Sequence, residues 1–438
     1  MNQEAAKEEK KNWLVGETAT AGTMYRTARL DMTRFFRLEK ASLPTLLNED
    51  EESMVRLVDS ILREALQSEA SDIHVEIHKD KTTVRYRIDG ILQDGMTLPP
   101  MLHGTLLSRI KVLAQMDIAQ KRIPQDGRIQ IEDQGKAIDL RVATLPTIFG
   151  ENCTIRILDK EKAPISLEDL CFQEKVLPLY KKMIQHSYGM ILLTGPTGSG
   201  KTTTLYSSLY CLNHREQKIV TIEDPVEYVL DGVSQIQVNS KAGLTFPWAL
   251  RSILRQDPDV IMVGEIRDQE TADIAVGAAI TGHLVLSTLH TGDAAGAVTR
   301  LIDMGLEPYR VASSVIGIVA QRLVRKICDH CKSSYTPEQD ALERFFLQVE
   351  PKKDVTLFKG LGCSACNQTG YKGRIAIHEV LPIKTEERQL IMNKASVEAI
   401  RQSATRGGMI TLREDGIYKA LQGYTTIQEV MRVAYRID

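Results

Sequence analysis

Residues 195–202 carry the clearest chemical pattern in the chain. They fit the phosphate-binding pattern G-x-x-x-x-G-K-[ST] and comprise Gly195, Pro196, Thr197, Gly198, Ser199, Gly200, Lys201 and Thr202. Glycines let the backbone wrap tightly, so that successive N–H groups point at phosphate oxygens. We expect Lys201 to reach the β- and γ-phosphates of ATP and the Thr202 hydroxyl to ligate Mg²⁺.

The flanking residues favour this interpretation over a glycine-rich turn that matches by chance. An apolar run at 190–194 is typical of a buried strand, and Thr203 opens a helix-compatible run at 203–212. A helix that begins at the loop adds its partial positive charge to the phosphate site.

Two acidic residues follow apolar runs that are also typical of buried strands. Glu265 follows 260–264, and Glu223 follows 219–222. Parallel strands end along one edge of a sheet, so both carboxylates are expected to face the phosphates, one at the metal's water shell and one at the attacking water. A helix cap or a surface charge is the alternative for either acid taken alone. His290 ends a third such run and is placed to sense the γ-phosphate, unless it is a structural hydrogen-bond partner.

Four of the seven cysteines form two Cys-x-x-Cys pairs, namely Cys328 with Cys331 and Cys363 with Cys366. The 31 residues between the pairs exceed the common zinc-ribbon spacing, but four thiolates still suit a tetrahedral structural Zn²⁺. Four unligated thiols are the alternative. In a reducing compartment the pattern indicates metal ligation rather than a disulfide framework.

The elements that must position these residues fall into two groups. After residue 168, short apolar strands (190–194, 219–222, 260–263 and 284–288) alternate with helical segments, which favours a mostly parallel sheet covered by helices. Residues 51–159 instead combine an amphipathic helix, a second helix at 102–116 and alternating strands, which predicts a small α+β domain. From residue 385 the pattern predicts short helices.

Composition narrows the function classes. The 55 Lys and Arg against 57 Asp and Glu leave a net charge of −2, so the whole molecule is not drawn to nucleic acid or anionic membrane. No apolar run approaches the roughly 20 residues of a membrane span, and no secretory signal opens the chain, which predicts a cytoplasmic protein. Residues 1–48 are expected to be a solvated arm, with an amphipathic helix at 30–38 as the alternative.

The chain resembles the ATPases of type II secretion and type IV pilus assembly, within the wider secretion-ATPase superfamily. The matching stretches cover roughly residues 50–438 in family order and are 71–76, 85–90, 122–128, 195–202, 221–227, 254–268, 281–291 and 320–325.

The resemblance implies a PAS-like domain at 49–159 after the arm at 1–48, a linker at 160–168, and a RecA-like ATPase core at 169–326. A tetracysteine zinc module at 327–371 and a helical region at 372–438 complete the expected α/β architecture. The implied assembly is a homo-hexamer, peripheral to the inner membrane through a platform protein. The zinc module is typical of assembly motors rather than retraction motors. Many family members carry a further folded domain ahead of the position of Glu51.

The resemblance also implies roles for single residues. Glu223 is the expected general base and Glu265 the partner of the Mg²⁺ water. Arg141 and Arg156 of the N-terminal domain are expected to approach the phosphates when the two domains close. Both lie in apolar strands, where an unpaired guanidinium is costly, so a nearby acid is the alternative partner. Arg255 is a further candidate for nucleotide contact, together with Arg251 and Arg267.

Two other classes of function compete with a hexameric ATPase that powers pilus or pseudopilus assembly. A nucleic-acid translocase is disfavoured by the net charge of −2 and the aromatic content of 5%, so no direct nucleic-acid contact is expected. A nucleotide-binding regulator without turnover is disfavoured by the presence of Lys201, Glu223 and Glu265 together.

Overall fold

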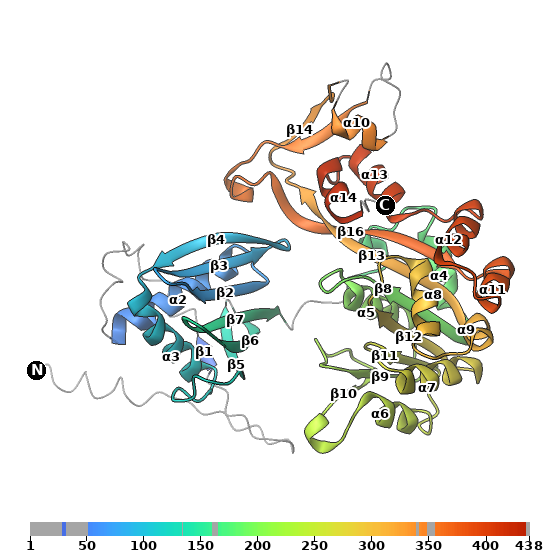
Figure 1. Cartoon of the computed structure of the whole chain (residues 1–438), viewed down its shortest axis with the longest axis horizontal. Helices are drawn as coiled ribbons and strands as arrows, with labels where there is room; N and C mark the ends of the chain where they lie inside the picture. Colours follow the sequence, from blue (N-terminus) through green and yellow to red (C-terminus); the bar gives the residue numbers. More distant parts are fainter. Residues whose placement is uncertain are drawn as a thin grey trace, which may run out of the picture. The chain divides into compact units, whose positions relative to one another are not determined.

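The computed structural model describes residues 29–31, 51–133, 135–159, 165–338, 341–347 and 355–434 of the 438-residue chain. The chain divides into two compact units, Met1–Lys162 and Ala163–Asp438, whose elements are labelled in Figure 1. Among the described residues, no helix is both long enough and apolar enough to cross a bilayer.

A largely antiparallel sheet forms the framework of the first unit. Its strands lie in the order β1-β5-β6-β7-β2-β3-β4, and only β1 and β5 pair in parallel. The strands are β1 (Arg29–Asp31), β2 (Asp72–Ile77), β3 (Thr82–Ile88), β4 (Ile91–Leu98), β5 (Gln125–Asp133), β6 (Lys136–Thr147) and β7 (Gly150–Asp159). Helices α2 (Glu51–Gln67) and α3 (His103–Leu113), with the 3₁₀ helix η3 (Pro100–Leu102), share a core with one face of the sheet.

Side chains alternate between the two faces of this sheet. Ile73, Val75, Leu140, Val142 and Ile155 are buried in the core with the helices. Residues between them in the sequence point to the opposite face because successive side chains of a strand alternate. Among the described residues of this unit, no helix covers that second face, so polar and charged side chains can occupy it.

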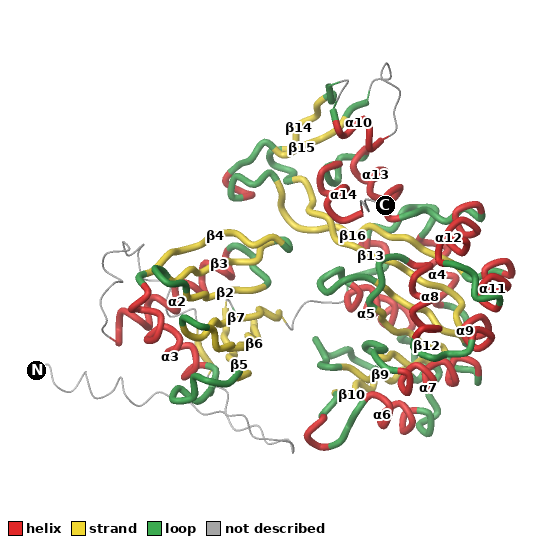
Figure 2. The backbone as a smooth tube through the Cα atoms, in the orientation of Figure 1, coloured by secondary structure: helices red, strands yellow, loops and turns green. Residues whose placement is uncertain are grey.

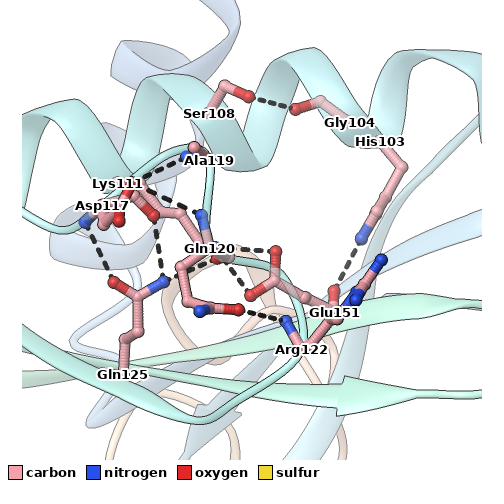
Figure 3. Close-up of polar contacts among 10 residues, drawn as sticks. All are labelled: His103, Gly104, Ser108, Lys111, Asp117, Ala119, Gln120, Arg122, Gln125 and Glu151. Atoms are coloured by element: carbon pink, nitrogen blue, oxygen red, sulfur yellow. Dashed lines mark hydrogen bonds and ion pairs between the residues drawn. The ribbon is translucent and has the colours of Figure 1, made fainter.

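A buried ion pair fixes the loop 117–124 that leads into β5 (Figure 3). Lys111 Nζ on α3 lies 2.7 Å from both carboxylate oxygens of Glu151 on β7, and the two side chains are only 2% and 7% exposed. The same ammonium group donates to the Gln120 carbonyl oxygen at 2.7 Å, and Gln125 Nε2 donates to that oxygen at 2.8 Å. The loop is therefore tied to both α3 and β7, which fixes where β5 begins.

A mixed sheet forms the framework of the second unit. Its strands lie in the order β10-β9-β11-β12-β8-β13-β16, and all neighbours are parallel except β13 and β16. The strands are β8 (Gly189–Thr194), β9 (Ile219–Glu223), β10 (Ser234–Gln237), β11 (Val260–Val263), β12 (Leu284–Leu289), β13 (Val315–Ile327) and β16 (Tyr371–Pro382).

Helices cover both faces of this sheet, because its central strands are apolar on both sides (Figure 2). Helices α4 (Leu177–Ile184) and α5 (Lys201–Leu212) share one core with it, and the 3₁₀ helix η4 (Glu168–Leu170) joins them. The other face packs against α6 (Phe246–Ile253), α7 (Gln269–Ile280), α8 (Ala294–Asp303), α9 (Pro308–Ser314), α11 (Thr385–Met392) and α12 (Val397–Arg406).

A smaller module follows β13. It contains the antiparallel pair β14 (Lys332–Tyr335) and β15 (Leu357–Gly360), with α10 (Leu342–Leu347) and the 3₁₀ helix η6 (Ser364–Cys366). Its small core joins that of α13 (Leu412–Leu421) and α14 (Ile427–Ala434) through residues such as Phe346, Leu357 and Val430. The short 3₁₀ helix η5 (Ser240–Ala242) lies after β10.

Side chains cap several helices where the sequence changes from loop to helix. Asp268 accepts a hydrogen bond from the N–H of Thr271 at the start of α7, and Asp293 accepts one from Gly296 at the start of α8. Thr411 and Glu414 form a reciprocal capping box on α13. These contacts satisfy N–H groups that the first turn of a helix leaves unpaired.

The predicted α/β class, with an α+β N-terminal part, a RecA-like sheet, a tetracysteine cluster and C-terminal helices, is confirmed. One prediction about its elements is wrong, because the region 372–438, expected to be helical, opens with β16. Strands β13 and β16 are largely buried on both faces, so they show no alternation that would distinguish them from helices. The arm 1–48 is described only at Arg29–Asp31, which is a strand where the alternative predicted a helix from residue 30.

The predicted linker 160–168 lies mostly outside the described residues, and the predicted domain boundaries stay predictions.

Candidate functional site

The phosphate-binding loop (the P-loop, residues 195–200) connects β8 to α5, as the sequence predicts. Gly200 caps α5 with a φ of 85°, and a Cβ atom there would lie 2.7 Å from Gln321 Nε2. A Cβ atom on Gly195 would lie 2.5 Å from the Gln321 carbonyl oxygen. Both positions therefore require glycine, because β13 packs directly against the loop.

Gln321 on β13 clamps the P-loop to the sheet. Its side chain is 1% exposed, its Nε2 donates to the Ser199 carbonyl oxygen at 2.8 Å, and its Oε1 accepts from Thr204 Oγ1 at 2.7 Å. Sequence analysis placed this residue in a family-like stretch, 320–325, but gave it no role. Its place in that stretch was the sequence signal that could have indicated a role for Gln321.

Lys201 lies against its own loop. Its Nζ donates to the carbonyl oxygens of Gly195 at 2.7 Å and Pro196 at 3.0 Å. Burial lowers the pKa of Lys201 to about 8, the positive charge of Arg322 lowers it as well, and the negative charge of Glu265 opposes both. Lys201 and Glu265 are thus close enough to influence each other.

Three further features of the P-loop fit a phosphate group. Ser199 Oγ is buried and has no hydrogen-bond partner within the described part of the chain. Gly198 has no atom within 4 Å of the place where a Cβ would stand, so the loop is open there. Thr202 is exposed in the first turn of α5, where a hydroxyl can ligate a cation bound to phosphate.

Glu265 directly follows Val263 and Gly264 at the end of β11. Its side chain is 14% exposed, and its carboxylate lies 2.5 Å from Arg267 Nη2 and 3.5 Å from His290 Nε2. Since β8, β9, β11 and β12 are parallel, their ends share one sheet edge with the P-loop. The structure therefore brings Glu265 and His290 together beside the P-loop.

Thr194 and Thr291 link the start of the P-loop to the residue after His290. Their hydroxyl oxygens lie 2.7 Å apart, and the Thr291 N–H donates to Thr194 Oγ1 at 2.8 Å. Arg322 donates to the carbonyl oxygens of Gln321 and Gly292 at the same place. Sequence analysis missed Arg322 as a cation beside the P-loop.

Glu223 ends β9 at the same sheet edge but is 3% exposed. Its Oε1 accepts from Thr221 Oγ1 at 2.6 Å and from Gln235 Nε2 at 3.2 Å. Its Oε2 accepts a short hydrogen bond from the hydroxyl of Tyr206 on α5. Protein donors therefore surround the carboxylate that the sequence predicted as the general base.

Arg255 is not brought to the P-loop of its own chain. It follows α6 and precedes the start of β11, which lies at the sheet edge opposite to the strand ends. Its guanidinium donates to the Arg251 carbonyl oxygen and to Ser252 Oγ. Its contact with nucleotide stays a prediction, and within this chain the distance between the two sheet edges disfavours it.

Arg141 and Arg156 lie on neighbouring strands of the first unit. Arg141 on β6 is paired in register with Arg156 on β7 and with Arg128 on β5, so the three form a line across the sheet, here called the arginine row. Arg156 is 57% exposed and its Nε donates to Asp72 Oδ1 at 3.1 Å. Asp72 is thus the nearby acid that the sequence offered as the alternative partner of Arg156, whose side chain points away from the helix-covered face. Sequence analysis also missed Arg128.

The four paired cysteines converge at the end of β13 and at η6. All four Sγ atoms lie within 4.8 Å of one another, and three of the separations are 3.7, 3.8 and 3.9 Å. A tetrahedral zinc site with Zn–S bonds of about 2.3 Å has sulfurs about 3.8 Å apart. Burial raises the pKa of Cys366, but N–H donors from Cys363 and Gly370 outweigh it and lower the pKa to about 6. The cluster therefore fits a structural metal held by thiolates.

Comparison with known proteins places this geometry in a family. The model of the family described as "Type II/IV secretion system protein" matches residues 47–432. Type II secretion system protein E of Pseudomonas aeruginosa is 49% identical over 385 residues, which are 88% of this chain and 76% of that protein. The type IV pilus assembly ATPase PilB of Thermus thermophilus is 48% identical over 389 residues, which are 89% of this chain but 44% of that longer protein.

Solved structures show the same fold. The pilus retraction motor PilT with bound ADP is 27% identical, has a TM-score of 0.57, and is matched over 86% of this chain and 97% of that one. The ATPase DotB of Legionella pneumophila, at 22% identity and a TM-score of 0.63, covers 86% of this chain and 95% of its own. The chain belongs to the type II/IV secretion system protein family of secretion and pilus-assembly ATPases, and it is an ATP hydrolase.

Proposed function

We propose that this chain hydrolyses ATP at the P-loop, as one subunit of a homo-hexamer, to power assembly of a type II secretion pseudopilus or a type IV pilus through an inner-membrane platform protein. The observation that carries the proposal is the P-loop itself, clamped by Gln321 with Lys201 and Glu265 beside it. The matched relatives include a type II secretion system ATPase E of Vibrio cholerae, 46% identical over 388 residues.

The P-loop residues bind and orient the triphosphate. Backbone N–H groups of Gly195 and residues 197–203, which include the start of α5, donate hydrogen bonds to its phosphate oxygens. Lys201 moves from its own loop carbonyls to the transferring phosphate. Bound Mg²⁺ supplies charge neutralisation, with Thr202 and Glu265 as the residues that hold it and its water. His290 and Arg267 fix the orientation of the Glu265 carboxylate.

The arginine row supports a second contact with phosphate. Side chains that lie opposite each other on neighbouring strands are close, and like charges in such pairs are destabilising. Three arginines in register therefore concentrate positive charge on one face of the sheet, which favours contact with an anion, and Asp72 already pairs with Arg156. We propose that Arg141 and Arg156, with Arg128, stabilise negative charge on ATP during hydrolysis.

Zinc binding by the cysteine cluster is proposed as structural. Inductively coupled plasma measurement is expected to find one zinc per chain, and Cys363→Ser to lower both zinc content and the melting temperature. A zinc-free parent protein of unchanged stability would contradict the proposal.

Hydrolysis by the P-loop is tested with Lys201→Ala. Loss of a charge-stabilising group at the transferring phosphate is expected to lower kcat by about 10²-fold or more. Steady-state ATP hydrolysis with Mg²⁺ measures this, and solution mass in an ATP analogue reports the hexamer. Equal turnover by parent and variant would show that the P-loop is not the working site.

A further inference from the structure

Both oxygens of Glu223 are engaged by the protein. Tyr206 donates to Oε2, while Thr221 and Gln235 donate to Oε1, and the side chain is 3% exposed. A general base must reach the proton that it removes, directly or through one water. With three protein donors on its two oxygens and 3% exposure, the Glu223 carboxylate serves the protein itself.

Tyr206 connects this carboxylate to two other parts of the site. It lies on α5, the helix that begins with Lys201. Its hydroxyl donates to Glu223 and accepts from the backbone N–H of Glu227 at 3.2 Å. Burial raises the pKa of Tyr206, and the hydrogen bond and charge of Glu223 raise it further, so the hydroxyl remains a donor throughout the pH range of an enzyme assay.

The turn from residue 224 to residue 227 is therefore tied to the P-loop helix. This turn follows the end of β9 and carries Asp224, which is exposed and whose charge acts on Arg267. Arg267 in turn pairs with Glu265. The hydroxyl of Tyr206 thus joins the P-loop helix to the acidic turn whose Asp224 acts on Arg267.

We infer that Tyr206 and Glu223 are positioning residues for ATP hydrolysis, which hold the 224–227 turn against the P-loop helix, and that Glu223 is not the base that activates water. The inference rests on the proposed ATPase function and changes the role expected for Glu223. Tyr206 acts through the turn that it holds, without touching the nucleotide.

Three single variants of the full chain test the inference. Tyr206→Phe deletes only the hydroxyl, and Glu223→Gln keeps an oxygen that can accept from Tyr206 or Thr221. Tyr228→Phe is the matched control, because it removes the same hydroxyl group from a ring that packs edge-on against Tyr206, with the ring centroids 4.5 Å apart. Melting temperatures establish that each variant is folded.

The expected results separate positioning from base catalysis. Tyr206→Phe and Glu223→Gln each lower kcat by about tenfold with KM little changed, and the double variant is no slower than either, since the two act as one unit. The acid limb of the kcat profile against pH stays at its parent position in Glu223→Gln. Tyr228→Phe behaves as the parent.

Two results would overturn the inference. A loss of about 10²-fold or more in Glu223→Gln, together with disappearance of the acid limb, would make Glu223 the base. Parent-like kcat in Tyr206→Phe would show that the hydroxyl positions nothing. Both results are interpreted only if the parent protein hydrolyses ATP and Lys201→Ala abolishes this activity. A parent without Lys201-dependent hydrolysis would contradict the proposed function and not the roles of Tyr206 and Glu223.

Discussion

The P-loop and the arginine row are held in place by different means. The P-loop residues are neighbours in the sequence, lie against one another and are clamped by the buried side chain of Gln321. The three arginines come from β5, β6 and β7 and are aligned only by strand register on a face that no described helix of their unit covers. The P-loop is thus fixed by local contacts and by the Gln321 side chain, whereas the arginine row is a concentration of positive charge set by strand register.

Removing the central charge of the row is expected to have the largest effect. Arg141→Ala should lower kcat by about 10³-fold, as loss of an arginine that stabilises a transferring phosphate does, while nucleotide affinity stays near the parent value because the P-loop provides it. Single-turnover hydrolysis and equilibrium binding of a fluorescent ATP analogue separate the two quantities. Arg85→Ala is the control, since Arg85 pairs with Glu76 outside the row. Unchanged kcat in Arg141→Ala would remove the row from catalysis.

Removing the contacts that Gln321 makes with the P-loop is expected to act on the stability of the protein, whereas removing Arg141 acts on kcat. Gln321→Ala leaves the Ser199 carbonyl oxygen and the Thr204 hydroxyl without their buried partner, which should lower the free energy of unfolding by about 2 kcal/mol. Urea unfolding measures the change, and nucleotide affinity should fall with it. Gln402→Ala, on the exposed side of α12, is the control and should shift stability by less than about 0.5 kcal/mol. Equal midpoints for the two variants would mean that the P-loop does not need the clamp.

The pH dependence of nucleotide binding is expected to be the smallest of the three effects. Lys201 has a pKa of about 8, and contact with phosphate raises it, so binding takes up a proton above pH 8. Affinity is therefore full below pH 8 and should fall by up to about tenfold per pH unit above it, until the pKa of the bound state is reached. Calorimetry in two buffers of different ionisation enthalpy detects the proton. Affinity independent of pH between 7 and 9.5 would contradict the assignment.

Most of the fold could be predicted where the pattern of apolar residues is unambiguous. Strand β11 occurs at the predicted residues, and β8, β9 and β12 differ from their predicted bounds by one residue, because short apolar runs are a local property of the sequence. Strands β13 and β16 could not be recognised, since a strand buried on both faces lacks alternation. The P-loop was predictable because its residues are adjacent in the sequence.

The rest of the site depends on contacts between residues far apart in the sequence. Gln321 lies more than a hundred residues from Ser199, and only the pairing of β8 with β13 brings them together. Arg128 joins the arginine row through strand register. The burial of Glu223 follows from Tyr206 and Gln235, on other elements, and no pattern around Glu223 indicates it.

Strand β13 sets a fixed spacing between the P-loop and the cysteine cluster of the second unit. Gln321 holds the P-loop, and seven residues later Cys328 begins the cysteine cluster, a span of about 23 Å for extended chain. Pairing with β16 extends along nearly all of β13, and Arg325 is held by Glu429 of α14 through both its backbone N–H and its guanidinium. Because a strand paired along its length cannot lengthen, β13 keeps the distance between Gln321 and Cys328 constant. A displacement of the P-loop along the strand must be accompanied by the same displacement of the cysteine cluster.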